Sequence, residues 1–395
     1  MKLYAQHGYG VGNKISEGID KDYIDGIIFS PRDIKRNKLR KKLEKYENDD
    51  IDLLFDPQLY VSLFDDEPTL KKRYLDTWNY YRGYRKSHLE QSKNIDDILQ
   101  DYYKTILSLK TTSIISPNIY LSKSFNSIEA VISKNFIRRA NSIFKEKDDN
   151  REVYASLIID WEAFLNKDDF EEFLDDLTLI NNKPDGIYLV IGSQSLNPQE
   201  EFYISDVISG WMKLNYVLTI NGYKVINGYS DILSPVFGAV GGIAGATGWW
   251  SNLRYFKMER FIPTRTGGRM PIPRYLSTLL YNRIKFDELD LVSSIIPEVK
   301  NNLTCDEYYD PEPDNREEEM LQSWEALKFL NNKLTSEGSD VELNLKIILN
   351  HIKKANNAYN NLKLNNIRLD NKSNGDHLLN IQSAIQEFQN WAEIG

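Results

Sequence analysis

The chain has 395 residues, a formal net charge of −9, 41% hydrophobic residues and 27% charged residues. This composition is typical of a globular protein with a core, and it argues against a surface that is basic overall, although local basic patches are compatible with it. No run approaches the about 18 apolar residues of a membrane span, and residues 1–14 lack the apolar stretch of a secretory signal. The single cysteine, Cys305, excludes an intramolecular disulfide and a cysteine-based zinc site. We expect a cytoplasmic protein without membrane contact.

Apolar runs alternate with helical patterns from about residue 24 to residue 286. Candidate strands cover residues 26–30, 52–55, 113–116, 155–159, 186–191, 216–220, 224–226 and 243–247, and helical patterns include 33–46, 127–144 and 167–179. The alternation predicts a parallel sheet, and about eight strands in roughly 260 residues match a (β/α)8 TIM-like barrel. An open doubly wound sheet is the alternative. Polar or proline residues directly after several strands, as at Asp56-Pro57, favour the barrel.

The stretch 224–256 reads as a strand, a polar turn, a short helix and a second strand, which is a βαβ unit. In such units ligands meet the chain just beyond the carboxyl ends of the strands. We therefore predict that the polar residues there line a ligand site: Asn227, Tyr229, Asp231, Thr247, Asn252 and Arg254.

One segment leaves the strand count open. The runs 216–220 and 224–226 are separated by Asn221-Gly222, a hairpin signal, and a hairpin would leave the barrel one strand short. Alternatively, residues 205–214 form the helix before a barrel strand at 224–226, with 216–220 as its lead-in.

The chain divides into three parts. Residues 1–296 are predicted to form the barrel, with a helical insertion at 68–110, and the acidic, proline-containing segment 297–315 reads as a linker. Residues 316–395 read as a C-terminal α-helical extension with helices at 317–334, 341–362 and 375–392. This extension is a candidate contact for a protein partner.

Two aspartates each follow an apolar strand, Asp56 in LLFDPQ and Asp160 in LIIDWEAF. In a barrel both would point into the mouth, as a general base and a ligand-orienting acceptor. The alternative is that each caps the helix that follows. Ser193 and Gln194, after the strand GIYLVIG, would present backbone N–H groups to a base or an anion, or else form an ordinary turn.

Two basic stretches are candidates for phosphate or nucleic-acid contact. Five arginines lie close together, Arg254, Arg260, Arg265, Arg269 and Arg274, and they suit phosphate recognition or simple pairing with the excess acid. Residues 71–86 interleave lysines and arginines with tyrosines and a tryptophan, a pattern that suits stacking on bases or packing onto the domain beneath. The basic helix at 32–45 is predicted to expose its charged side chains to solvent.

Several other chemistries are excluded by spacing. Gly8, Gly10 and Gly12 lack the preceding strand and the following Lys-Ser/Thr of a phosphate-binding loop. The four histidines show no metal-ligand spacing, and there is no G-x-S-x-G nucleophile motif. We expect no metal and no cofactor.

The strand ends together resemble the tRNA-guanine transglycosylase superfamily. LLFDPQ corresponds to the family's aspartate-led stretch with Asp56 at the acid, and LIIDWE places Asp160 at its second base-reading aspartate. LVIGSQS resembles the glycine-rich base-binding turn, and VINGYSDIL with GAVGGIAGAT resembles the helix and strand that follow. The resemblance implies a (β/α)8 barrel that exchanges a guanine base for a deazapurine. The family's zinc motif is absent, and its nucleophilic aspartate has no counterpart unless a shifted register places Glu259 there.

The sequence thus predicts a TIM barrel that acts on or binds a nucleobase or nucleotide, free or within tRNA or DNA. Asp56 and Asp160 would contact the base or transfer protons, and the arginines would hold phosphates. One alternative is a non-catalytic barrel that serves as the binding subunit of a larger nucleic-acid-processing or defence complex. The other is a barrel hydrolase of glycosides or phosphoesters.

Overall fold

Eight parallel strands form a nearly closed barrel in a computed structural model that describes residues 1–64, 73–122, 124–145, 149–193, 202–261, 272–307, 309 and 316–395. The strand order is β3-β2-β1-β9-β8-β7-β6-β4. Backbone and side-chain hydrogen bonds between Leu53 and Thr112, both at 2.9 Å, join the β3 edge to the segment before β4. The bounds are β1 (Lys2–Gln6), β2 (Gly26–Phe29), β3 (Asp52–Phe55), β4 (Ser113–Ser116), β6 (Glu152–Asp160), β7 (Gly186–Ser193), β8 (Lys224–Gly228) and β9 (Ala244–Thr247). The predicted TIM-like barrel is confirmed.

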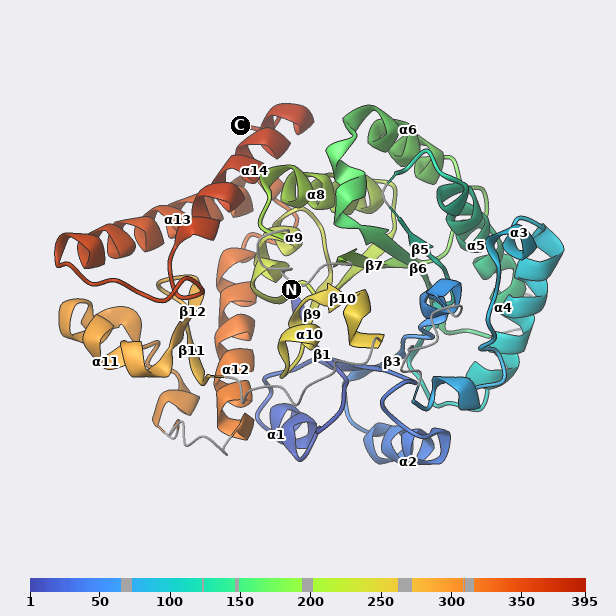
Figure 1. Cartoon of the computed structure of the whole chain (residues 1–395), viewed down its shortest axis with the longest axis horizontal. Coiled ribbons are helices and arrows are strands. Elements are labelled where there is room, and N and C mark those ends of the chain that lie inside the picture. Colours follow the sequence, from blue (N-terminus) through green and yellow to red (C-terminus); the bar gives the residue numbers. More distant parts are fainter. Residues whose placement is uncertain are drawn as a thin grey trace.

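Helices surround the strands (Figure 1). In chain order they are α1 (Lys14–Asp20), α2 (Arg36–Tyr46), α3 (Lys86–Leu89), α4 (Ser92–Ile106), α5 (Ile128–Lys145), α6 (Lys167–Thr178), α8 (Ser205–Ile220), α9 (Ser234–Ala239) and α12 (Arg316–Leu334). Further elements lie outside this ring on one side of the barrel: the antiparallel pair β11 (Arg274–Ser277) and β12 (Asn282–Lys285), then α11 (Phe286–Ile295), α13 (Val341–Leu364) and α14 (Asp376–Ala392).

Among the described residues the barrel has eight strands, as predicted, but one of them is not a predicted strand. The segment 216–220 is the end of α8, and Gly222 with a φ of +76° terminates that helix, so there is no hairpin at Asn221-Gly222. The strand that the sequence analysis did not predict is β1, which pairs with both β2 and β9. The glycines at 8, 10 and 12 therefore do follow a strand, contrary to the prediction.

The helix α12 belongs to the ring around the barrel. It packs against α1, α9 and β1, and an added Cβ at Gly18 of α1 would lie 2.8 Å from the ring of Trp324. Ser234 of α9 donates a hydrogen bond to Asn331 of α12 at 2.8 Å. Because a (β/α)8 barrel places its eighth helix after its eighth strand, α12 takes that place, and residues 248–315 form an insertion between them. The linker predicted at residues 297–315 therefore comes before a helix that packs as part of the barrel.

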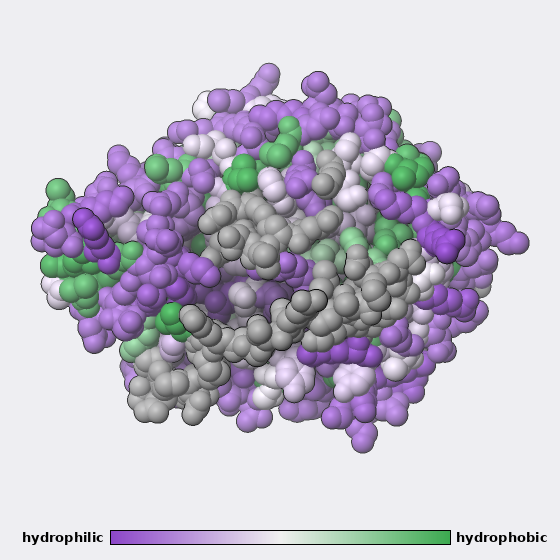
Figure 2. Space-filling model, viewed as in Figure 1, coloured by the Kyte–Doolittle hydropathy of each residue, from purple (hydrophilic) through white to green (hydrophobic). Residues whose placement is uncertain are grey.

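The last two helices pack on the outside of the ring. Tyr216 of α8 contacts Phe388 and Trp391 of α14, with ring centroids 5.5 and 6.4 Å apart. The three predicted C-terminal helices are confirmed within a few residues. In the described part of the chain no helix is long and apolar enough to cross a membrane. The face in Figure 2 is mostly hydrophilic, with apolar residues in small separate patches.

The amino end of the barrel is filled by side chains. An added Cβ at Gly26 would approach Tyr4, and one at Gly186 would approach Tyr154, so these glycines make room for the two rings. Lys2 pairs with Asp52 at 2.6 Å at the same end. The opposite end, at the carboxyl ends of the strands, is called the mouth below.

Candidate functional site

Asp56, directly after β3, lies at the mouth and is 0% exposed. One carboxylate oxygen accepts a hydrogen bond from the backbone N–H of Gln58 at 3.0 Å, and the other accepts one from the Tyr60 hydroxyl at 2.9 Å. Burial raises the pKa of Asp56 to about 6, and the two hydrogen bonds offset this only in part. A carboxyl group with such a pKa can both accept and release a proton near neutral pH.

Asp160, the last residue of β6, is 2% exposed. It accepts hydrogen bonds from the backbone N–H of Glu162 at 3.1 Å and from the Tyr120 hydroxyl at 2.7 Å. The first is an N-cap of the short helix η3 (Trp161–Leu165). Capping, the alternative given above for this residue, is observed, and a contact with a ligand stays a prediction.

Phe256 lies against both of the tyrosines that hold these acids. Its ring centroid is 5.2 Å from that of Tyr60 and 6.3 Å from that of Tyr120. The strand β10 (Phe256–Lys257) pairs with the end of β7 at Gly192, where an added Cβ would lie 2.7 Å from the Phe256 ring. The glycine therefore permits the ring to enter the mouth. Phe256 is itself 0% exposed, so the two aspartates do not face each other across an open cleft.

A buried arginine occupies the mouth next to this ring. Arg260, in the short helix η5 (Met258–Phe261), donates to the Tyr229 hydroxyl at 2.8 Å and forms an ion pair with Asp33. Arg32 donates to the backbone carbonyl of Arg260 at 2.6 Å. Burial alone would raise the pKa of Asp33, but Arg260 and Arg32 outweigh it and hold that pKa below its usual value. Of the five predicted phosphate-binding arginines, Arg260 is thus placed at the mouth.

Two buried carboxamides at the mouth, Gln6 and Gln58, each keep an NH2 group without a hydrogen-bond partner among the described residues. Their oxygens are occupied: Gln6 accepts from the Tyr188 hydroxyl at 3.4 Å, and Gln58 accepts from the backbone N–H of Arg32 at 3.3 Å. Burial raises the pKa of Tyr188, and the charge of Asp56 raises it further. A buried donor left unpaired costs about 1–3 kcal/mol. We call Gln6 and Gln58 the amide pair.

Asp231 is held entirely by groups of the protein. Arg283 of β12 binds both of its carboxylate oxygens, with Nη2 at 2.8 Å from Oδ1, and the Thr247 hydroxyl donates at 2.6 Å. Tyr255 donates at 3.3 Å. Burial would raise the pKa of Asp231, but Arg283 and Arg254 outweigh it and lower that pKa. This residue therefore ties the ends of β8 and β9 to β12.

The other predicted mouth residues are dispersed. Asn227 accepts from Trp211 at 2.7 Å and donates to Asn215 at 2.8 Å, so its side chain faces α8 and not the barrel axis. Ser193 is fully buried beside β10, and Asn252 is half-buried on α10 (Ser251–Arg254).

The predicted arginine loop is not a single surface. Arg254 donates to the carbonyl of Gly248 at 3.3 Å, and Arg274 binds Asp370 at 2.7 Å. Two of its predicted members, Arg265 and Arg269, lie outside the described residues, as does Gln194 of the turn after β7.

The aromatic residues of the basic stretch 71–86 mostly point inward. Trp78 donates to the carbonyl of Pro31 at 3.3 Å and Tyr80 to that of Pro57 at 2.7 Å. Trp78, Tyr80 and Tyr81 are buried. Packing onto the domain, the alternative given above, is confirmed for these three rings, and stacking on bases is contradicted for them.

Sequence reasoning missed most of the partners at the mouth. Gln58 and Tyr60 follow Asp56 directly, so the pattern DPQLY held a local signal for both. Gln6 was missed together with its strand. No local signal marked the ion pairs of Asp33 with Arg260 and of Arg283 with Asp231, because the partners lie far apart in the chain. In the part of the chain that the structure describes, no three His, Cys, Asp or Glu side chains gather as a metal site.

Comparisons with known proteins assign no family. No protein-family model matches the chain, and no curated protein matches it. Among solved structures it is similar to a dihydrodipicolinate synthase from Oceanobacillus iheyensis, at 9% identity and a TM-score of 0.26, over 94% of this chain and 99% of that one. That likeness is too low to support an argument, so the barrel rests on its strand order and register.

Proposed function

We propose that the mouth of this TIM barrel binds a nucleobase, either free or as part of a nucleotide, tRNA or DNA. The proposal rests on the buried Asp56 at the mouth together with the amide pair, whose two NH2 groups have no hydrogen-bond partner among the described residues. Natural proteins rarely leave buried donors unpaired, and those that do usually hold them for a ligand or water. Two NH2 donors and one carboxyl group match the carbonyl oxygens, ring nitrogens and N–H groups on the edge of a base.

Asp56 is the group suited to move a proton in this site. With a pKa of about 6 it is ionised in a large fraction of molecules at neutral pH, yet it is readily protonated. It would take a proton from a ring nitrogen or return one. The resemblance to the transglycosylase superfamily supports base exchange as the class of reaction, with Asp160 as the second acid.

Ligand entry requires the segment of β10 and η5 to move. Phe256 and Arg260 fill the space above Asp56, and both are buried. The rings of Phe256, Tyr60 and Tyr229 would then be the surfaces on which a base stacks, since every base has an aromatic face.

A second candidate is a non-catalytic barrel that acts as a binding subunit. The observation in its favour is that Asp160 and Asp231 are both fully engaged by neighbouring groups of the protein. A hydrolase of glycosides or phosphoesters would also use paired acids, but it has no observation of its own in support.

The experiment is a binding screen of the purified full chain by thermal shift and calorimetry. Probes are guanine, 7-deazaguanine, adenine, nucleotides, tRNA and DNA, and the Asp56→Asn/Asp160→Asn double variant is measured alongside. Saturable binding of a base that the variant loses supports the proposal. Base binding that survives in the variant, or no base binding, contradicts it, and the second candidate then leads.

A further inference from the structure

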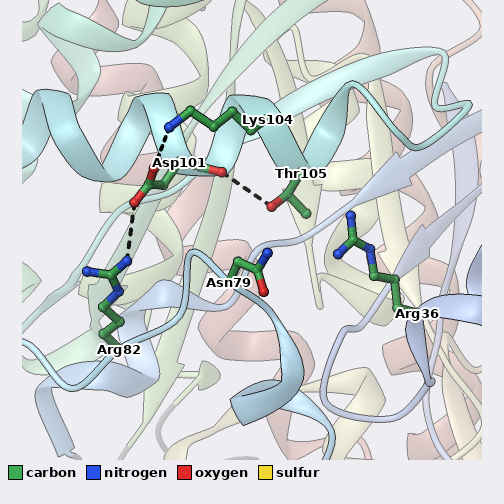
Figure 3. A pocket seen from close by; sticks show the side chains of 6 residues that line it. All are labelled: Arg36, Asn79, Arg82, Asp101, Lys104 and Thr105. Carbon is green, nitrogen blue, oxygen red and sulfur yellow. Dashed lines mark hydrogen bonds and ion pairs between the residues drawn. The ribbon is translucent and has the colours of Figure 1, made fainter.

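A pocket of about 410 Å³ lies on the outer wall of the barrel between α2 and α4. Its lining comes from three separate segments: Arg36 from α2, Asn79 and Arg82 from the segment before α3, and Asp101, Lys104 and Thr105 from α4. Figure 3 shows the cationic groups on opposite sides of the pocket, with Asn79 between Arg82 and Arg36. Two stretches that the sequence marked as basic, 32–45 and 71–86, meet here.

The pocket carries a local excess of positive charge on a protein whose formal net charge is −9. Three cationic side chains face one carboxylate, that of Asp101. Asp101 binds Lys104 at 2.9 Å and Arg82 at 3.5 Å. One carboxylate cannot neutralise three cations, so an anion is favoured in the pocket.

Arg36 gives the pocket a fixed donor. Its Nη2 donates to the Ser108 hydroxyl at 3.2 Å, and its guanidinium carbon is 6.0 Å from the centroid of the Trp78 ring. Its Nε is buried and has no hydrogen-bond partner among the described residues. A guanidinium group held in this way loses little conformational freedom when it binds an anion.

We propose that this pocket is a binding site for the phosphate group of a phosphorylated ligand. Arginine and lysine donors recognise phosphate through charge-assisted hydrogen bonds. A volume of about 410 Å³ exceeds that of a single phosphate and lies in the range of small-molecule sites, about 300–1,000 Å³. The Asn79 amide is placed to contact the remainder of the ligand. The phosphate belongs either to a phosphate monoester or to a nucleic-acid backbone, and the test below separates the two.

This site is separate from the mouth. The buried rings of Phe55, Trp78 and Tyr102 form a cluster at the outer side of β3, with Phe55 4.9 Å from Trp78 and 6.4 Å from Tyr102 between centroids. Asp56 lies on the opposite side of that strand, because successive side chains alternate between faces. The inference therefore does not depend on the proposed function.

The test is calorimetric titration of the full chain with inorganic pyrophosphate, AMP and a single-stranded oligonucleotide, using Arg82→Gln and Lys104→Gln variants. Arg138→Gln on α5 is the matched control, because Arg138 is also exposed but is not among the residues that line the pocket. We expect saturable binding of at least one probe, weakened about tenfold or more in each pocket variant and unchanged in the control. Tighter binding of AMP assigns a phosphate monoester. Tighter binding of the oligonucleotide, with a steep dependence on salt, assigns a nucleic-acid backbone.

A variant that is expected to bind more tightly serves as a control, because misfolding would not increase the affinity. Asp101→Asn deletes the competing carboxylate, and we expect it to tighten binding of the same probe several-fold. The proposal is overturned if no probe binds, if Arg82→Gln and Arg138→Gln behave alike, or if Asp101→Asn leaves the affinity unchanged or weaker.

Discussion

Arg283 of β12 forms a bidentate ion pair with both carboxylate oxygens of Asp231 at the end of β8. The two residues lie far apart in the sequence, and their ion pair is buried. The pair joins the β11–β12 hairpin to the barrel, so the insertion of residues 248–315 is anchored at the carboxyl ends of the strands.

Breaking this pair should destabilise the protein strongly. Arg283→Met leaves the Asp231 carboxylate buried without its main partner, a change that typically costs about 3–5 kcal/mol. Urea denaturation at pH 7 measures the free energy of unfolding. The control is Arg274→Met, which removes a half-buried partner of Asp370 and should cost about 1 kcal/mol or less. Equal losses in the two variants would contradict the role of the pair.

The same pair should make stability fall in acid. The pKa of Asp231 is lower in the folded protein than in the unfolded chain, so its contribution is complete above pH 4. It is lost as the pH falls through the lower folded value. In Arg283→Met this acid-dependent loss should be smaller, and unfolding curves between pH 5 and pH 2.5 measure the difference. Parallel curves for the two proteins would count against this account.

Ionisation of Asp56 should lower the stability of the folded protein as the pH rises, the opposite of the effect of Asp231. Its folded pKa of about 6 lies above its unfolded value, so ionising it in the folded protein is unfavourable. The penalty is absent below pH 4, grows between pH 4 and 6, and reaches about 3 kcal/mol above pH 6. Asp56→Asn removes the charge, so we expect this variant to gain stability over the wild type at pH 8 and about half as much at pH 5. At each pH the stability of the variant is compared with that of the wild type. If the variant loses more stability at pH 8 than at pH 5, the carboxylate is stabilising and the account is wrong.

Gly192 and Phe256 should be energetically coupled. A Cβ at residue 192 would lie 2.7 Å from the Phe256 ring, so Gly192→Ala should cost about 1–3 kcal/mol through overpacking. Phe256→Leu leaves more room at that point. The double variant should therefore be more stable than the sum of the single losses predicts, and a double-mutant cycle measures the coupling. Strict additivity would mean that the two residues do not meet.

Truncations test the place of α12 in the ring. A chain that ends at residue 315 lacks the helix that packs on α1, α9 and β1, so we expect it not to unfold cooperatively. A chain that ends at residue 336 loses only α13 and α14, and it should keep a cooperative transition at a lower temperature. Circular dichroism melting distinguishes them. A cooperative melt for the shorter chain would place α12 outside the barrel.

The sequence predicted the barrel because its strands and helices alternate with strong periodicity. It missed β1, since residues 2–6 form a single short run with no helical pattern before it. It misassigned residues 216–220 because Val217 and Thr219 favour strands locally, while packing of α8 against α14 keeps them helical. The two errors cancel: one strand was missed and one helical segment was taken as a strand, so the predicted number of strands was still eight.

The candidate site was predictable only where its residues follow a strand end. Asp56 and Asp160 were found by this rule, and both are at the carboxyl ends of their strands. The rule could not foresee that Asp231 would be bound by Arg283, or that Phe256 and Arg260 would fill the mouth. Those contacts depend on how the insertion after β9 folds back, which no local pattern encodes.

The amide pair offers the most direct test of a nucleobase site at the mouth. Gln6→Met and Gln58→Met replace the unpaired NH2 groups by apolar groups of similar size, and calorimetric titration with guanine and 7-deazaguanine is compared with the thermal melt of the free protein. We expect each variant to bind the base at least about tenfold more weakly. Its melting temperature should fall only modestly, because the substitution removes an unpaired NH2 donor but also the oxygen that accepts from the Tyr188 hydroxyl or the Arg32 backbone N–H. Unchanged base binding in both variants, or a wild type that binds neither base, would contradict the proposed site.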